Sequence, residues 1–194
     1  MSRDNEGRTP PRKRDREVLD AAAKVFYAEG FAGASVQQVA DELGMLKGSL
    51  YYYIKSKDEL LRRLIDETHA ELAAIVDEVV AMDADPKARL HRFVERSVQY
   101  NVDNLARISV YYDDLARVDE ERRREIYADQ RAQEDIVVDL VKSLRTDAAD
   151  ARKYAMCVFS TIIWTYRWYR PSRFPEGDIA RVCADFAVRG VVEG

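Results

Sequence analysis

The sequence predicts an all-α protein of about nine helices. Apolar residues recur at three- and four-residue steps along most of the chain, as they do on one face of an α-helix. The sequence shows no strand-like alternation, internal repeat or low-complexity segment. With 194 residues, the chain is long enough for two helical units that share one long helix.

The first expected helix spans residues 12–29. Gly30 is expected to end it, because glycine readily adopts the positive φ found at helix C-termini. Residues 1–11 precede this helix and are expected to form a disordered basic arm. Pro10 and Pro11 are expected to discourage an earlier helical start.

Two short helices joined by a tight turn are expected next. Ser35 and Gln38 form a capping box, so the second helix should start at Val36. Gly44 can turn with positive φ, and a short third helix is expected over 47–54. Helix, glycine-containing turn and short helix together are the layout of a helix-turn-helix.

This N-terminal unit, residues 12–56, lies in the more basic part of the chain. Residues 1–63 hold 12 Lys and Arg against 10 Asp and Glu, whereas the whole chain has a net charge of −4. A basic end on an acidic body suits contact with phosphate at that end only. The alternative interpretation is that the basic residues at the start of the chain form a solvated tail without a binding role.

A long helix is expected from Lys57 to about Met82, because Ser56 and Glu59 form a second capping box. It leaves the N-terminal unit and enters a C-terminal unit, residues 57–194. The other helices of that unit are expected over 86–104, 107–116, 119–144, 148–170 and 178–189.

Cys157 and Cys183 lie in apolar surroundings and are expected to be buried thiols in a reducing cytoplasm, a disulfide being less favoured. The most apolar segment, 154–169, is too short for a bilayer span and contains Ser160 and Arg167. The N-terminus has no apolar run that would indicate a signal peptide. A soluble, cytoplasmic protein without membrane contact is therefore expected.

The chain carries the pattern S-x-x-x-V-A-x-x-L-G from Ser35, followed by K-G-S-L-Y-Y-Y-I-K-S-K-D-E-L from Lys47. This pattern resembles the DNA-binding domain of the TetR family of transcriptional regulators. The resemblance covers residues 12–63 closely and the remainder only by helix count and length. It implies a homodimer on a palindromic operator, with a C-terminal domain that dimerises and binds a small effector, usually releasing the DNA.

The resemblance also implies roles for residues at matching positions. Lysine supplies charge for phosphate, glutamine and lysine can read base edges, and tyrosine combines a hydroxyl with a flat ring. Leu50 and Ile54 are expected in the core, and Tyr51 could instead pack inward. The predicted DNA-binding residues are Ser35, Gln37, Lys47, Gly48, Ser49, Tyr51, Tyr52, Tyr53 and Lys57.

Leu46 departs from the pattern of many relatives, which have Ser or Thr there as the cap of the recognition helix. Acyl-CoA-responsive branches of the family include members with an apolar residue at this position. The run W-T-Y-R-W-Y-R-P over 164–171 resembles the end of the penultimate helix in that group. Steroid-type relatives can carry Arg where this chain has Ser160, so a plainer acyl-CoA or another apolar effector stays open.

Aromatic rings beside arginines could hold an apolar group whose CoA carries phosphates. The run Y-Y-D-D over 111–114 adds candidates. A Trp and Tyr stripe could equally form core or dimer interface. The predicted ligand-binding residues are Phe93, Tyr100, Tyr111, Tyr127, Arg131, Phe159, Trp164, Arg167, Trp168 and Arg170. The expected dimer interface is a four-helix bundle that includes Val158, Ile162, Val182, Phe186 and Arg189.

An enzyme is not expected. His69 and His91 are the only histidines and lack metal-ligand spacing, and no Gly-rich phosphate loop or nucleophile motif occurs. No catalytic residue, metal site or cofactor is therefore predicted. The predicted function is a ligand-responsive DNA-binding repressor. A helical interaction module that has lost DNA binding is the alternative, against which Lys47, Tyr51 and Lys57 argue.

Overall fold

The computed structural model describes residues 11–145, 148–174 and 178–193. Within these ranges the chain forms ten α-helices and two 3-10 helices and contains no strand, which confirms the all-α fold class. Most of the predicted arm, residues 1–11, lies outside this description. Pro11 belongs to the first helix instead, because its fixed φ and missing amide hydrogen suit a first turn.

Helix α1 (Pro11–Gly33) changes direction at Gly30, whose φ of 69° lies in the left-handed region. The regular part of the helix therefore ends where the sequence predicts. The carbonyl of Gly30 accepts the amide of Ala34 at 3.0 Å. Phe31 turns back and meets Phe26 edge to face, with ring centroids 5.2 Å apart.

Helix α2 (Val36–Glu42) has the predicted capping box. The Ser35 side chain accepts the amide of Gln38 at 3.2 Å, and the Gln38 side chain accepts the amide of Ser35 at 2.8 Å. Gly44 follows with a φ of 62°, so it makes the predicted turn toward the third helix.

Helix α3 (Lys47–Leu50) is shorter than the predicted span of 47–54. Residues 51–53 form hydrogen-bonded turns instead, with the amide of Tyr53 donating to the carbonyl three residues earlier at 2.8 Å. Three consecutive tyrosines propagate a helix poorly. Leu46 makes no side-chain cap, as expected for leucine.

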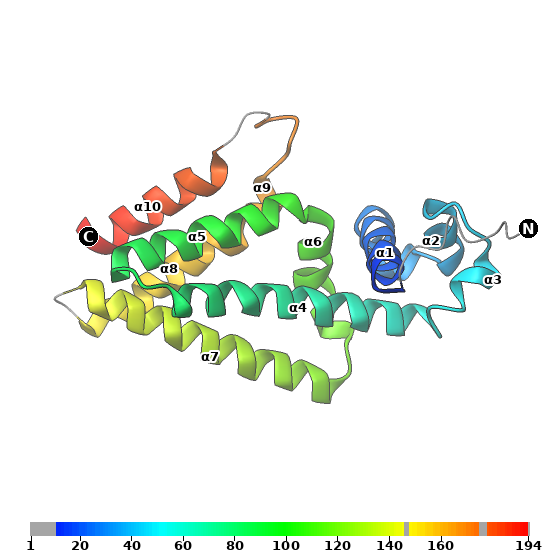
Figure 1. Ribbon diagram of the computed structural model, residues 1–194, viewed down its shortest axis with the longest axis horizontal. Helices are drawn as coiled ribbons and strands as arrows, with labels where there is room; N and C mark the ends of the chain where they lie inside the picture. The colour runs from blue at the N-terminus through cyan, green and yellow to red at the C-terminus, as the bar shows by residue number, and fades with distance from the viewer. Residues whose placement is uncertain (1–10, 146–147, 175–177, 194) are drawn as a thin grey trace, which may run out of the picture.

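Helix α4 (Lys57–Ala81) joins the two units, with α1–α3 at one end and the remaining helices along the rest of its length (Figure 1). Ser56 caps it by accepting the amide of Glu59 at 3.1 Å. Its first half buries side chains such as Leu64 in the N-terminal unit. Its second half buries side chains such as Ile75 in the C-terminal unit.

After α4, the C-terminal unit continues with α5, in which Pro86 takes the predicted first helical position. Helix α10 packs against α5 and α8, and α7 packs against α5 and α8 (Figure 1). Each helix in the described ranges is too short or too polar to cross a lipid bilayer. The elements are α5 (Pro86–Asp103), α6 (Leu105–Asp114), η1 (Leu115–Arg117), α7 (Glu120–Leu144), η2 (Ala148–Asp150), α8 (Ala151–Ile163), α9 (Thr165–Trp168) and α10 (Ile179–Glu193).

The single helix predicted over 148–170 is broken at Trp164, between α8 and α9. Two side chains donate hydrogen bonds to backbone carbonyls at the break. Asn101 of α5 donates its Nδ2 to the carbonyl of Ile162 at 2.9 Å, and Thr165 donates its hydroxyl to the carbonyl one turn earlier at 2.9 Å. These side chains replace helix hydrogen bonds, so α9 can pack against α5 and α6.

A buried arginine ties the two units together. Arg107 of α6 is only 2 % exposed, and its Nε donates to Asp20 of α1 at 2.7 Å. Its Nη1 lies 3.4 Å from Glu67 and 3.8 Å from Glu71, both on α4. Burial lowers the pKa of Arg107, but the hydrogen bond and charge of Asp20 and the two glutamates outweigh burial and raise it. The cation therefore holds α1, α4 and α6 at one point.

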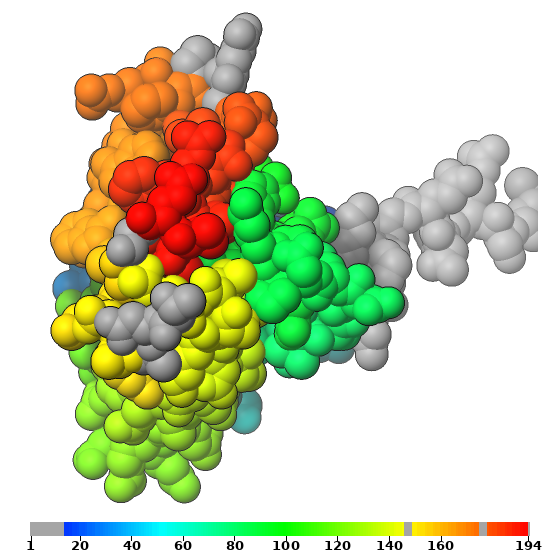
Figure 2. Space-filling model, turned by 90° about the vertical axis from the view of Figure 1, so that its left-hand side faces the viewer, coloured from blue at the N-terminus to red at the C-terminus, as the bar shows by residue number. Residues whose placement is uncertain are grey.

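Helix α10 lies on the surface of the C-terminal unit (Figure 2). Its side chains Val182 and Phe186 are 53 % and 70 % exposed. The expectation that Val158 and Ile162 belong to a dimer interface is wrong. Both are buried inside the single chain, because α8 turns that face toward the core.

The two cysteines differ from each other. Cys183 on α10 is buried as expected, and burial raises the pKa of its thiol. Cys157 was expected to be buried but is exposed. It sits on the outward side of α8, next to the inward-facing Val158.

Candidate functional site

An exposed polar surface covers the end of the molecule that α2, α3 and the following turn form. Tyr51 is 48 % and Tyr52 is 85 % exposed, whereas Leu50 and Ile54 are buried beneath them, as expected. Tyr51 therefore faces outward rather than into the core. We call this region the α2–α3 surface, and it comprises Ser35, Gln37, Lys47, Gly48, Ser49, Tyr51 and Tyr52.

The chemistry of the α2–α3 surface suits a polyanion. Lys47 is exposed and can bring positive charge to phosphate. A Cβ built at Gly48 would meet no atom within 4 Å, so the missing side chain leaves open space on the outside. A partner backbone can approach α3 closely at that point.

Two predicted DNA-binding residues, Tyr53 and Lys57, have internal contacts. The Lys57 ammonium donates to the carbonyls of Phe31 and Ala34 at 2.8 and 2.9 Å, and it lies 4.5 Å from the centre of the Phe31 ring. Tyr53 packs on the core of the N-terminal unit and meets Tyr52 edge to face at 5.6 Å. Lys57 therefore fixes the turn after α1 to the start of α4.

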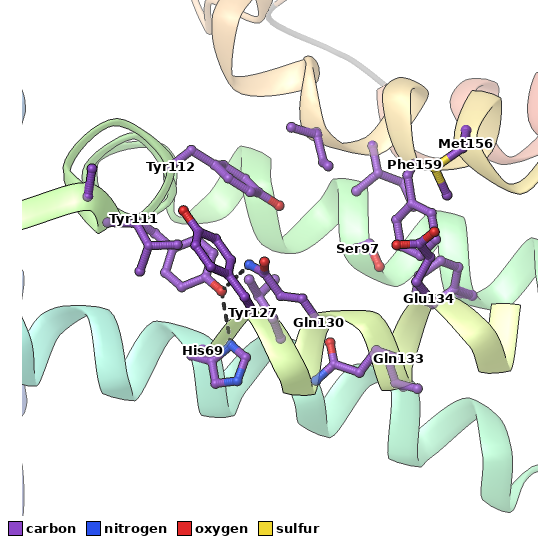
Figure 3. Close-up of a pocket in the computed structure, with 17 residues that line it drawn as sticks. His69, Ser97, Tyr111, Tyr112, Tyr127, Gln130, Gln133, Glu134, Met156 and Phe159 are labelled. Atoms are coloured by element: carbon purple, nitrogen blue, oxygen red, sulfur yellow. Dashed lines mark hydrogen bonds between the residues drawn. The ribbon is translucent and has the colours of Figure 1, made fainter. Parts of the chain in front are cut away.

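A cavity of about 450 Å³ lies in the C-terminal unit between α4, α5, α6, α7 and α8 (Figure 3). This volume falls in the range of small-molecule sites. Aliphatic and aromatic side chains make up most of its wall, and no Lys or Arg is among the described residues that line it. The polar lining residues are His69, Ser97, Tyr111, Tyr112, Tyr127, Gln130, Gln133 and Glu134.

A chain of hydrogen bonds closes one end of the cavity (Figure 3). Gln130 donates its Nε2 to the Tyr111 hydroxyl at 2.8 Å, so the phenol hydrogen is left for Nδ1 of His69, which lies 2.9 Å away. The other ring nitrogen of His69 lies 3.4 Å from Asp129. The Tyr111 hydroxyl thus links α7 to α4 at this end of the cavity. Burial raises the pKa of Tyr111 to about 12.

Of the ten predicted ligand-binding residues, the cavity brings together Phe93, Tyr111, Tyr127 and Phe159. The ring of Phe93 meets the ring of Phe159 edge to face at 5.9 Å, which forms part of the apolar wall. Tyr100 lies elsewhere and donates its hydroxyl to Glu71 at 2.7 Å.

The other five predicted ligand-binding residues also lie outside this cavity. Trp164 and Trp168 are 59 % and 41 % exposed. Arg167 pairs with Asp113, Arg170 donates to the carbonyl of Tyr169, and Arg131 donates to the carbonyl of Tyr127. The break at Trp164 explains part of this placement, because it changes which residues of the segment face inward.

Sequence reasoning missed several polar lining residues. On α7, Gln130 and Gln133 stand at helical spacing between the buried Ile126 and Val137. Two glutamines that interrupt an inward-facing apolar stripe are a signal that could have indicated a polar cavity wall. His69 was weighed only as a metal ligand or catalytic residue.

Comparison with known proteins identifies the family. A family model described as "Bacterial regulatory proteins, tetR family" matches residues 18–64, and one described as "Tetracyclin repressor-like, C-terminal domain" matches residues 83–191. The chain is 30 % identical over 166 residues to the HTH-type transcriptional repressor KstR2 of Mycobacterium tuberculosis, with 80 % of each chain covered. The chain belongs to the TetR family.

Solved structures of TetR-family proteins share the fold. The ketosteroid transcriptional regulator KstR2 of Mycobacterium tuberculosis superposes with a TM-score of 0.76 at 28 % identity, covering 93 % of this chain and 94 % of that one. AibR, solved in complex with isovaleryl coenzyme A and operator DNA, gives a TM-score of 0.75 at 22 % identity, covering 91 % and 97 %. The TetR family and these relatives are transcriptional regulators and not enzymes.

A second surface of this TetR-family chain exposes two large apolar side chains among charged ones. Val182 and Phe186 of α10 line a shallow groove with Asp185, Arg189, Gly190 and Glu193. We call this region the α10 surface. Large exposed apolar side chains grouped on one face are typical of a protein interface.

Proposed function

We propose that the chain is a ligand-responsive transcriptional repressor, which binds a palindromic operator as a homodimer and is released by a small apolar effector. One observation carries the proposal. The cavity wall residues His69, Leu72 and Val76 lie on α4, and the same helix starts directly after the α2–α3 surface. A shift of α4 caused by an effector would move that surface.

The α2–α3 surface is the proposed DNA contact. Its lysine, amide and hydroxyl groups supply phosphate and base contacts, and Gly48 leaves room for the DNA backbone. Tyr53 and Lys57 also stand at matching positions, and their internal contacts favour a supporting role there. Two such surfaces in a two-fold dimer would read half-sites about 34–36 Å apart. Operator binding would place this activity in the cytoplasm.

The α10 surface is the proposed dimer contact. Phe186 and Val182 would otherwise leave apolar area in water, and a two-fold contact would bury the same patch on both subunits. Of the interface residues expected from the sequence, Val182, Phe186 and Arg189 remain in this proposal.

An acyl-CoA thioester is the proposed effector class. The apolar cavity suits an acyl group, and AibR, which shares the fold, was solved with isovaleryl coenzyme A. Because no Lys or Arg lines the described cavity wall, the CoA phosphates would stay outside it. Arg131 follows the lining residue Gln130 on α7 and is exposed, so it is a candidate for their contact.

The test measures binding of the purified chain to DNA from its own upstream region and to a shuffled duplex of equal length, by fluorescence anisotropy at moderate salt. Preference for the upstream DNA is expected, with affinity that falls steeply as salt rises. Equal binding of both duplexes would remove the repressor function. A panel of acyl-CoAs and the matching free acids then tests the effector, and release by free acids alone would remove the role of CoA.

A further inference from the structure

Tyr112 places a hydrogen-bond donor in the cavity that has no acceptor among the described residues. Its ring stacks on Tyr166, with centroids 5.4 Å apart, and meets Tyr111 edge to face at 5.2 Å. These contacts fix the ring, and its hydroxyl points toward the middle of the cavity, away from the hydrogen bonds of Tyr111 (Figure 3). None of the described residues hydrogen-bonds to that hydroxyl.

The environment of Tyr112 keeps the phenol protonated. Burial, followed by the neighbouring Tyr111 and Tyr166, raises the pKa of Tyr112 above its ordinary value. The group therefore acts as a donor throughout the physiological pH range. A ligand oxygen at this point would accept the phenol hydrogen in largely apolar surroundings, where a hydrogen bond is stronger than in water.

The described lining of the cavity contains no Lys or Arg. The Nδ1 atom of His69 is engaged by the Tyr111 hydroxyl at 2.9 Å, and its other ring nitrogen lies 3.4 Å from Asp129. The one carboxylate of the lining, that of Glu134, pairs with Arg152 at 2.9 Å. A carboxylate ligand buried here would lack a counter-ion and would lie in the same cavity as Glu134.

We infer that the effector buries an uncharged body bearing one acceptor oxygen, as in a ketone, ester or thioester, and that Tyr112 determines specificity by donating to that oxygen. This inference rests on the proposed function, because it takes the cavity as the effector site. Ser97 also lines the cavity from α5, but a serine on a helix can turn its hydroxyl to its own backbone. A phenol cannot turn its hydroxyl to its own helix backbone in this way. Tyr112 is therefore the main hydrogen-bond donor to the ligand oxygen.

Three probes of similar size separate the contributions of the oxygen and of charge. They are 2-undecanone, its carbon isostere 2-methyl-1-undecene, and undecanoate. Each is titrated into the full chain without DNA, and binding is followed by calorimetry and by the rise in melting temperature. We expect the ketone to bind about tenfold more tightly than the alkene, as for one buried hydrogen bond, and undecanoate to bind more weakly than the ketone.

The variant Tyr112→Phe keeps the ring and removes the donor. We expect it to lower ketone affinity about tenfold and to leave alkene affinity unchanged. Tyr27→Phe is the matched control. It also removes a phenol hydroxyl, but Tyr27 is exposed on α1 and does not line the cavity, so ketone affinity should not change.

The carbonyl stretch of bound 2-undecanone gives a second readout. Its infrared frequency should be lower in the wild-type chain than in Tyr112→Phe, because the hydrogen bond weakens the C=O bond. If the variant does not fold, two measurements on the wild-type chain still test the inference. They are the ketone–alkene affinity ratio and the carbonyl frequency of bound 2-undecanone, which should be lower than in an alkane solvent.

Three results would overturn the inference: no ketone binding by the wild-type chain, equal affinity for ketone and alkene, or tighter binding of undecanoate. Operator binding is measured separately. A chain that prefers its upstream DNA but fails these tests would keep the repressor function and lose the assigned role of Tyr112.

Discussion

Arg107 and Tyr111 lie one turn apart on α6 and bind partners in different units. Arg107 donates to Asp20 of α1 at 2.7 Å, whereas Tyr111 bonds to His69 of α4 inside the cavity at 2.9 Å. An effector that displaced the Tyr111 ring would therefore strain the α6 contact with α1. Both contacts can be tested one at a time.

Replacing Arg107 by methionine should lower the free energy of unfolding by about 1–3 kcal/mol, because Asp20 and the partly exposed Glu67 and Glu71 would lose the buried cation that they share. Urea denaturation measures the loss. The control is Lys142→Met, since Lys142 pairs with Asp139 on the surface and should contribute less than about 1 kcal/mol. Equal losses in the two variants would show that the cluster does not hold the units together.

Alkaline pH should destabilise the chain through Tyr111. Its folded pKa of about 12 lies above the ordinary value of about 10. A raised folded pKa contributes stability that is present below about pH 10 and is lost as pH rises toward about 12. Urea unfolding at several alkaline pH values should show this fall, and Tyr111→Phe should show a smaller one. A fall of the same size in the variant would assign the effect to other groups.

Lys47→Ala should weaken binding to upstream DNA and reduce the slope of log affinity against log salt by about one per subunit. The lysine is exposed on the α2–α3 surface, so the fold should keep its melting temperature. Lys142→Ala provides the control, because Lys142 pairs with Asp139 at the far end of α7. An unchanged slope for Lys47→Ala would favour the interaction-module alternative.

Lys57→Met separates a structural role from a DNA contact. Two backbone carbonyls would lose their donor, and the free energy of unfolding should fall by about 1–3 kcal/mol. The salt slope of DNA binding should stay the same, measured well below the melting temperature. A reduced slope with full stability would show instead that Lys57 contacts phosphate.

Phe186→Glu should convert the dimer to monomers, because it places a charge on the 70 % exposed apolar centre of the α10 surface. Sedimentation velocity measures the change. Val80→Glu is the matched control, since Val80 is also an exposed apolar residue but lies on α4. Dimers that survive the Phe186 substitution would move the interface elsewhere.

Local signals in the sequence were sufficient for most of the helices. Ser35, Ser56, Pro86 and Asp119 each mark a helix start through the side chain or ring next to the first turn. Gly30 and Gly44 mark turns because their φ values are positive. These features depend on residues within one helical turn of each other, and their helices follow from the sequence.

The break at Trp164 has a cause that the local sequence does not contain. Asn101, whose side chain donates a hydrogen bond to the carbonyl of Ile162, is 61 positions away from Ile162 in the chain. The same limit applies to the cavity. Tyr111 and Tyr112 are adjacent and equally aromatic, and only the contacts of Tyr111 with His69 and Gln130, both distant in the sequence, distinguish the two hydroxyls. Periodicity finds the inward side of a helix but does not show which inward positions face empty space.

The described residues that line the cavity lie on helices α4–α8 and η1, and none lies on α10. A dimer formed through the α10 surface would thus hold two separate cavities. It could exist with none, one or both of them occupied. The steepness of induction in a cell, as effector concentration rises, would then report whether one occupied subunit is enough to free the promoter.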